Sequence, residues 1–238
     1  MTVIGTNVSA MRATTASTRA EMGLSKTMER LSTGQRINSA SDDAAGLAIA
    51  TKMTSEVRGL NMAKRNANDG ISLVQTAEGG MNQITNSLQR MRELAVQSAN
   101  GTLGDADRAN LQKEVAALKD QITSITDNTT FNGVDLLKGD GTTPGTAKSV
   151  AIQTGANANQ QVTVSIADVR TSQLTDGTTT VAAIDISTDV GATAALGSLD
   201  AALKTVTTAQ ADLGASQNRL QATVSSLDDR VTNLSESR

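Results

Sequence analysis

Apolar residues recur at every third or fourth position along the stretch from about Asp43 to Ala99. This spacing places them on one face of a helix, and its persistence over many turns is typical of a coiled-coil-like seam. Asn68, Asp69 and Gly70 have the chemistry of a turn, but the seam keeps its register across them, so we predict one continuous helix. The seam consists of Ile49, Met53, Val57, Leu60, Ala67, Ile71, Val74, Met81, Ile84, Leu88, Met91 and Ala95.

Two further stretches repeat this pattern. A shorter helix is predicted from Asp105 to about Asn128, after a glycine-containing link at 100–104 that suits a hairpin of helices. A third stripe runs from Leu196 to Leu234, and we expect this helix to pack back along the first two because the periods match. The expected seam residues are Leu88, Met91, Ala95, Leu111, Leu118, Leu203, Leu213, Leu220 and Leu227.

The remaining segments carry weaker patterns. From Ile4 to Leu31 the apolar stripe is sparse and filled with Thr and Ser, so this predicted helix cannot bury much alone. Strands are predicted at 131–138 and within 149–169, where apolar and polar residues alternate around a turn at 155–159. Residues 139–148 and 171–190 are rich in Gly, Thr and Asp and are predicted to be surface loops.

The predicted fold class is therefore mainly α: an elongated rod of long antiparallel helices, coiled-coil-like, with a small β-hairpin region in the middle of the chain. Composition supports extended seams, because the 238 residues include one Phe and no Trp or Tyr to anchor a compact core. The net charge of only -3 and the lack of a basic stripe argue against a nucleic-acid partner.

Several kinds of chemistry are excluded by residue type. The chain has no Cys and no His, which removes disulfides, thiolate nucleophiles, His-based catalysis and Cys/His zinc sites. Ser41, Asp42 and Asp43 could supply oxygen ligands to calcium or magnesium, but we expect them to cap a helix. No stretch of 18 apolar residues exists to span a membrane, and the N-terminus lacks the regions of a secretory signal peptide.

Three blocks of sequence carry a family resemblance. They read ERLSTGQRINSASDDAAGLAIA at 29–50, RNANDGISLVQTAEGGMNQITNSLQRMRELAVQSANGT at 65–102, and FNGVDLLKG at 131–139. The chain resembles bacterial flagellin, with a variable region reduced to 140–190, and residues 199–238 resemble the family's returning helix. The resemblance implies three parts: residues 1–38 in the terminal filament-core domain, 39–139 with 191–238 as the helical rod, and 140–190 as the hairpin and loops.

The family normally continues beyond the SESR-like point into a terminal helix that pairs with the N-terminal one, and this chain stops at Arg238. We therefore expect a form lacking that C-terminal helix, in which residues 1–31 have no partner within the chain and are poorly ordered in solution.

The resemblance implies a structural role without chemistry. We expect a secreted subunit, exported through the flagellum's own type III channel, that polymerises into the flagellar filament for motility. The implied partners are other copies of the chain, hook-associated and cap proteins, and an export chaperone, with no cofactor. A hook–filament junction protein of the same axial family is the alternative. An enzyme is not expected, because an HExxH motif needs histidine and 140–190 is too short for an inserted fold.

The stretch LQRMRELAVQSANGT at 88–102 contains the candidate functional residues. At about 100° per residue, Arg90, Glu93, Leu94 and Gln97 point away from the seam. One interpretation is a solvated surface; the other is a surface that packs against a neighbouring subunit. The resemblance adds that the flagellin-sensing Toll-like receptor of animals binds this motif, and it adds Gln89 and Glu114 to the patch. Arg92 lies nearer the seam and is expected to brace it.

Overall fold

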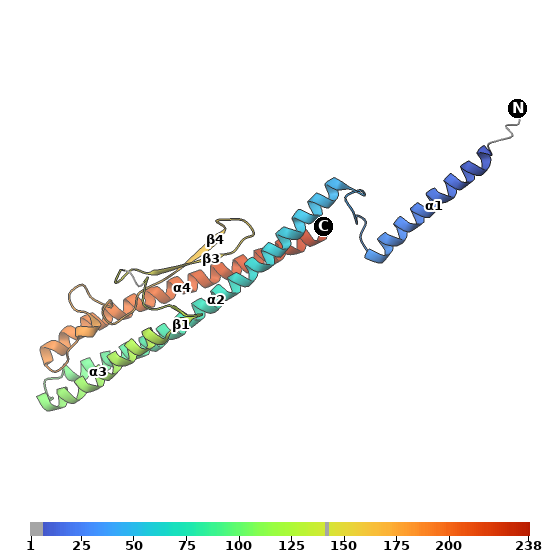
Figure 1. Cartoon of the computed structure of the whole chain (residues 1–238). Coiled ribbons are helices and arrows are strands. Elements are labelled where there is room, and N and C mark those ends of the chain that lie inside the picture. Colours follow the sequence, from blue (N-terminus) through green and yellow to red (C-terminus); the bar gives the residue numbers. More distant parts are fainter. Residues whose placement is uncertain (1–6, 141–142) are drawn as a thin grey trace. The chain divides into compact units, whose positions relative to one another are not determined.

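The structure is a computed structural model that describes residues 7–140 and 143–238 (Figure 1). It forms two compact units: the chain up to Val57 together with Leu234–Arg238, and the larger unit Arg58–Asn233. The long helices are α2 (Ala44–Ser98), α3 (Asp105–Asn128) and α4 (Asp189–Ser237), preceded by α1 (Val8–Thr33). Each unit is described separately.

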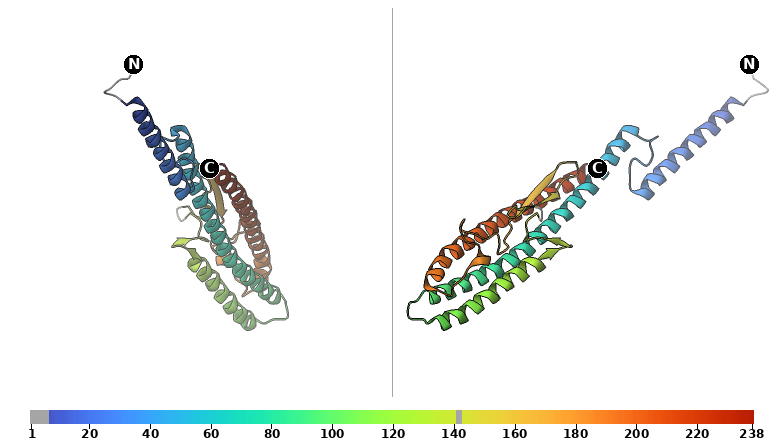
Figure 2. Two further views of the ribbon diagram at one scale, coloured as in Figure 1. Left: turned by 90° about the vertical axis from the view of Figure 1, so that its right-hand side faces the viewer. Right: turned by 60° about the vertical axis from the view of Figure 1, so that its left-hand side comes forward.

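In the larger unit α2 lies between two antiparallel neighbours. Figure 2 shows α3 running back along one side of α2 and α4 along the other. The predicted fold class is confirmed, and the bounds of α2 and α3 agree with the predicted helices to within one residue. Helix α2 passes through Asn68, Asp69 and Gly70 without a break, because the continuous seam outweighs the local turn chemistry.

The predicted hairpin is present and packs one face on the helices. Strands β3 (Lys148–Gln153) and β4 (Gln161–Ile166) are antiparallel, with Ile152 opposite Val162. Alternate β4 residues are buried, as the period-two pattern predicts. The hairpin approaches α2 so closely that a Cβ at Gly70 would collide with Cδ1 of Ile152.

The segment predicted as a strand at 131–138 is mostly not one. Only the two-residue strands β1 (Thr130–Phe131) and β2 (Val134–Asp135) form. They are joined by Asn132 and Gly133 with φ of 49° and 76°, the left-handed conformation that a tight hairpin turn requires. Leu136 and Leu137 then leave the strand and are fully buried, so this apolar run serves the core and not a sheet.

The prediction that 171–190 is only a surface loop is wrong. Leu174, Val181, Ile184 and Ile186 are at most 2% exposed, and η1 (Val181–Ala183) lies within the segment. Polar side chains hold this stretch against α3: Lys119 Nζ donates to the carbonyl of Ile184 at 3.0 Å and to that of Ala182 at 3.1 Å. Four isolated apolar residues among Thr and Asp have no regular period, so the pattern did not reveal their burial.

In the smaller unit α1 is a well-capped helix with no buried residue. The Asn7 side chain accepts a hydrogen bond from the Ala10 amide at 3.0 Å, and Gly34, with φ of 68°, ends the helix by donating to the Arg30 carbonyl. The first residues of the predicted segment, up to Thr6, lie outside the described residues. Whether α1 is poorly ordered in the free chain stays a prediction.

The capping role expected for the Ser41–Asp43 segment is confirmed. Asp43 Oδ1 accepts a hydrogen bond from the Gly46 amide at 2.8 Å, which caps the first turn of α2. Asp42 Oδ2 accepts hydrogen bonds from the amides of Asn38 and Ser39, and its Oδ1 lies 2.5 Å from Lys26 Nζ on α1. Asp42 therefore ties the connector between α1 and α2 to α1 itself.

These contacts give the connector a defined response to acid. The Lys26 ammonium, followed by the Asn38 amide, lowers the pKa of Asp42 to about 2. Because the pKa is depressed in the folded state, the contacts contribute fully above the unfolded pKa of about 4 and are lost as pH falls toward 2. We expect the amide resonances of Asn38 and Ser39 to shift with a midpoint near pH 2 in an NMR titration. Lys26→Met should move that midpoint upward; an unchanged midpoint would show that the ion pair does not form in solution.

Candidate functional site

An exposed charge cluster joins α2 to α3 at the predicted patch. Arg90 on α2 lies 2.9 Å from Glu114 Oε1 on α3 and 2.9 Å from Glu93 Oε2 one turn along its own helix. The side chains are 50%, 43% and 67% exposed respectively. The hydrogen bonds that Arg90 donates to Glu93 and then to Glu114 raise the pKa of Arg90, and the two carboxylates orient its guanidinium. Gln89 and Gln97 are exposed on the same helix.

The expectation that Leu94 faces outward with these residues is wrong. Leu94 is 1% exposed and belongs to the main apolar core. The prediction placed all core contacts of α2 on one narrow stripe, whereas α3 and α4 lie on two sides of α2 (Figure 2). Leu94 and Leu88 are about 120° apart around the helix, which is the width of buried face that two neighbours cover. The exposed patch therefore consists of Gln89, Arg90, Glu93, Gln97 and Glu114, and we call it the α2–α3 patch.

Arg92 braces the other side of α2, as expected. Its Nε donates to Asp200 Oδ1 on α4 at 2.6 Å, and this hydrogen bond raises the pKa of Arg92. Arg90 and Arg92 thus tie α2 to different neighbours. Both contacts lie at the surface, since the Arg92 side chain is 46% exposed and that of Arg90 is 50% exposed.

The expected seam residues from Leu88 to Leu227 lie along the helix contacts, whereas Ile49, the first residue predicted for the α2 seam, is 57% exposed. Leu111, Leu118 and Leu203 are partly buried against the core. The fully or almost fully buried members are Leu88, Met91, Ala95, Leu213, Leu220 and Leu227.

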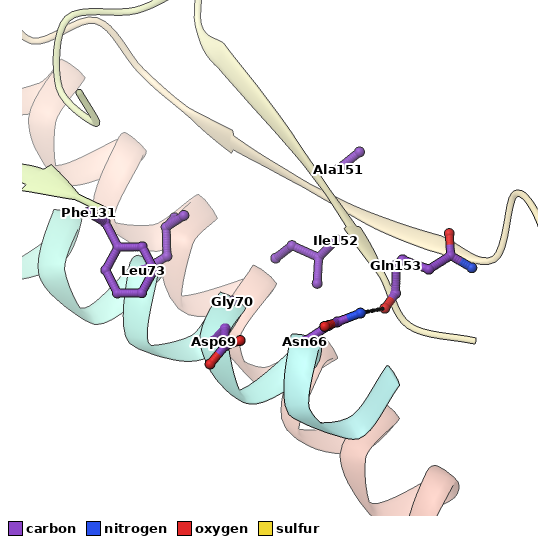
Figure 3. A pocket seen from close by; sticks show the side chains of 8 residues that line it. All are labelled: Asn66, Asp69, Gly70, Leu73, Phe131, Ala151, Ile152 and Gln153. Atoms are coloured by element: carbon purple, nitrogen blue, oxygen red, sulfur yellow. Dashed lines mark hydrogen bonds between the residues drawn. The ribbon is translucent and has the colours of Figure 1, made fainter. Parts of the chain in front are cut away.

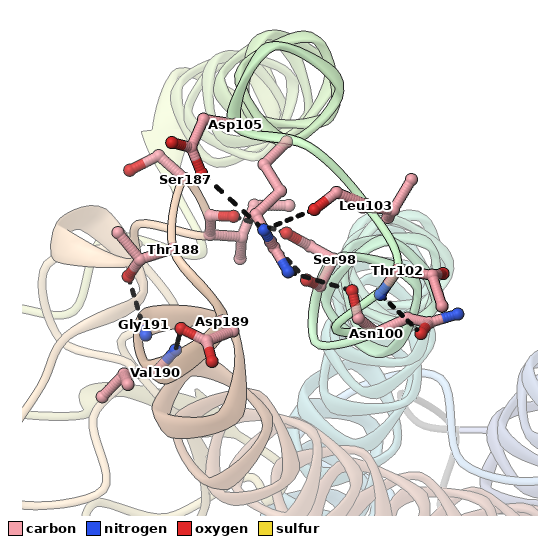
Figure 4. A network of polar contacts seen from close by, with 12 residues as sticks. Ser98, Asn100, Thr102, Leu103, Asp105, Ser187, Thr188, Asp189, Val190 and Gly191 are labelled. Atoms are coloured by element: carbon pink, nitrogen blue, oxygen red, sulfur yellow. Dashed lines mark hydrogen bonds and ion pairs between the residues drawn. The ribbon is translucent and has the colours of Figure 1, made fainter.

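A network of polar contacts at the tip of the helical hairpin, which includes Ser98, Asn100 and Leu103, was not predicted (Figure 4). Arg108 is 6% exposed, and its guanidinium donates to the carbonyls of Ser98, Asn100 and Leu103 at 2.8–2.9 Å. These carbonyls lie at the end of α2 and in the link, where a helix leaves acceptors unpaired. The sequence signal was a basic residue in the first turn of α3, directly after a link that has to satisfy such groups.

A second tie at the tip involves the segment before α4. Ser98 Oγ donates to the Ile186 carbonyl at 2.5 Å, and the Ile186 amide donates to Gln112 Oε1 at 2.9 Å. At the tip, hydrogen bonds therefore join the end of α2, helix α3 and the segment before α4.

A shallow groove lies where β3 crosses α2 (Figure 3). Asn66 Nδ2 donates to the Gln153 carbonyl at 3.1 Å at one end, and Phe131, the only aromatic residue of the chain, lies at the other. The groove has a volume of about 350 Å³. Its lining is mostly apolar and Asp69 is its only titratable residue, so it lacks the paired groups of acid–base chemistry.

The described residues contain neither a cluster of candidate metal ligands nor a membrane-spanning helix. Nowhere in the described part do three or more acidic side chains gather closely enough to hold a metal ion. Among the same residues, no helix combines the length and the apolar character needed to cross a membrane.

Comparison with known proteins finds matches at both ends of the chain. Residues 4–142 match the bacterial flagellin N-terminal helical region, and residues 196–238 match the bacterial flagellin C-terminal helical region. The second match means that the expectation of a chain lacking the C-terminal helix is not supported. Because the two matches together span most of the chain, they also agree with a short middle region.

Individual relatives differ in how much of them the chain spans. It is 44% identical to a flagellin of Halalkalibacterium halodurans over 88% of this chain and 74% of that protein. It is 50% identical to flagellin B of Vibrio anguillarum over 70% of this chain but only 43% of that protein. A putative flagellar hook-associated protein from Vibrio parahaemolyticus, 18% identical, has a similar structure with a TM-score of 0.70 over 84% of this chain and 98% of that one. At that identity the likeness shows the fold alone.

Proposed function

Because this chain belongs to the bacterial flagellin family, and is thus a structural, non-enzymatic subunit of the extracellular flagellar filament that serves motility, we propose that the α2–α3 patch is its contact surface. Two partners bind this surface: a neighbouring subunit in the filament, and the flagellin-sensing Toll-like receptor of animals.

The observation that carries this proposal is the fixed, exposed guanidinium of Arg90. It is held between Glu93 and Glu114 on two rigid helices, so a partner meets a charge whose orientation is already set. Arginine is enriched among the residues that carry interface energy because its planar fork offers several donors at once. Gln89 and Gln97 add polar groups beside it. Since the two partners cannot bind the same surface at once, the receptor recognises only the free subunit.

Replacement of Arg90 by alanine separates binding from folding. The side chain is half exposed and contacts only exposed carboxylates, so its removal should change the melting temperature little. Loss of a central anchor costs about 2 kcal/mol, or roughly thirtyfold in affinity. We expect Arg90→Ala to melt like the parent and to bind the receptor roughly thirtyfold more weakly in a surface plasmon resonance titration.

Two matched variants complete this test. Arg65→Ala removes an exposed arginine from the same helix outside the patch and should bind like the parent. Leu94→Ala should lower stability by about 2–5 kcal/mol, because a buried leucine is lost. Receptor affinity that is equal in Arg90→Ala and in the parent would refute the receptor half of the proposal.

We further propose that α1 contacts other copies of the chain within the filament, in line with the expected assignment of residues 1–38 to the filament core. Six large apolar side chains of α1 are between 51% and 85% exposed, which leaves the helix without a buried face in the single chain. The export chaperone and the hook-associated and cap proteins remain proposed partners, with no surface assigned to them. We also propose that residues 39–139 with 191–238 form the helical rod of the subunit. Residues 140–190 are proposed to be its reduced variable region.

The hook–filament junction role is the weaker candidate. The hook-associated likeness is one of fold, whereas 44% identity relates the chain to a flagellin over most of both sequences. Electron microscopy of the protein added to filament fragments decides between the roles. Long filaments support the subunit role, and a short collar that stops growing would contradict it.

A further inference from the structure

Five of the described methionines occupy two opposite environments. Met11, Met22 and Met28 on α1 are 61%, 60% and 63% exposed. Met81 and Met91 on α2 are 0% exposed within the main core. The same chemical group is therefore present in water-accessible and water-excluded forms in a single chain, so any reagent that attacks it should discriminate between them.

The thioethers are also the most easily oxidised groups that the chain contains. It has eight Met but no Cys, Trp, Tyr or His, the other side chains that common oxidants attack. An oxidant that meets the free subunit is thus directed to methionine sulfur, and first to the sulfurs that solvent reaches.

We propose that Met11, Met22 and Met28 form an oxidative modification site whose occupancy controls assembly through α1; this rests on the proposed filament function. The oxidant is a peroxide. A lone pair of Sδ attacks one oxygen of hydrogen peroxide, the O–O bond breaks and an S–O bond forms. The thioether is oxidised to a sulfoxide and the peroxide is reduced to water.

The modification changes α1 without changing the core. A sulfoxide is polar and chiral, so it places a strong dipole among the apolar side chains that α1 presents to a neighbouring copy. Burying that dipole without a hydrogen-bond partner opposes packing. Helix α1 has no buried residue in the single chain, so oxidation of these sulfurs disrupts no buried side chain of the helix. The site therefore acts on association and leaves the fold of Arg58–Asn233 intact.

The order of oxidation tests the site directly. The full chain is treated with hydrogen peroxide, quenched over time, digested and analysed by peptide mass spectrometry. We expect the three α1 methionines to gain oxygen at least about tenfold faster than Met81 and Met91, which react only when the core opens. Equal rates at the α1 and core methionines would overturn the proposal.

The consequence for assembly is tested with the variant M11L/M22L/M28L. This variant keeps the apolar volume of α1. It also keeps all other methionines, including the half-exposed Met62. After peroxide, the parent should fail to add to filament fragments while the triple variant still adds, and methionine sulfoxide reductase should restore the parent. Equal loss in both proteins would overturn the proposal. If the untreated parent fails to add, the filament role itself is refuted, and with it the assembly half of this inference, while the oxidation order still decides the modification site.

Discussion

Replacement of Leu220 by aspartate is expected to destabilise the larger unit severely. Leu220 is fully buried on α4, and its Cδ1 lies near Gly70 on α2, where the helices and β3 meet. The variant loses a packed side chain and buries a carboxylate without a partner, which together cost at least about 4 kcal/mol. That is a large share of the roughly 5–15 kcal/mol by which domains are stable. Urea denaturation followed by circular dichroism measures the loss.

The neighbouring Gln221 provides the matched control. It is exposed on the same turn of α4, so Gln221→Asp adds the same charge without burying it. Its free energy of unfolding should stay within about 0.5 kcal/mol of that of the parent. Equal midpoints for Leu220→Asp and the parent would show that α4 does not pack on α2 as described.

Replacement of Arg108 by methionine should produce the second large effect. The methionine fills much of the volume but donates no hydrogen bond, so the carbonyls of Ser98 and Leu103 lose the guanidinium, while the Asn100 carbonyl keeps its hydrogen bond from the Leu103 amide. A buried carbonyl is costly to leave unpaired, and we expect a total loss of about 3 kcal/mol. Hydrogen exchange should show the loss first at the tip, in the last turn of α2 and the first turn of α3.

Arg92→Met is the control for charge and side-chain length. Arg92 is 46% exposed and forms one ion pair with Asp200, so its loss should cost no more than about 1 kcal/mol. Similar losses in the two variants would mean that the buried hydrogen bonds of Arg108 contribute no more than a surface ion pair.

The sequence predicted those features that depend on local spacing. Helices α2 and α3 and the buried face of β4 follow from periods of 3.6 and 2, which survive in any tertiary context that buries one face. Leu94 was misplaced because the prediction gave α2 one buried stripe, although α3 and α4 cover two sides of it. How far apart two neighbours lie around a helix is a property of the assembled bundle and cannot be read from the period of one helix.

The candidate site shows the same division. The exposed positions of Arg90 and Glu93 followed from helical phase, and the contact with Glu114 depended on the antiparallel pairing of α2 and α3. The burial of Val181 and Ile186 and the role of Arg108 could not be predicted, because each depends on a long-range partner without periodic spacing. The period of the hydrophobic residues can be read from a short stretch of sequence. The partner of an isolated polar or apolar group cannot, because it is set by contacts between distant parts of the chain.

The order of α2, α3 and α4 along the chain also has a consequence for folding kinetics. Arg90 and Glu114 are separated by 24 residues, whereas Lys64 and Asp228, which join α2 to α4, are separated by 164. Closing the longer loop costs roughly 2 kcal/mol more chain entropy. We therefore expect the α2–α3 hairpin to form early, with the docking of α4 as the slow step that limits the folding rate. Until that step, the face of α2 that α4 covers stays open to water, and the chain is held as a partly structured intermediate.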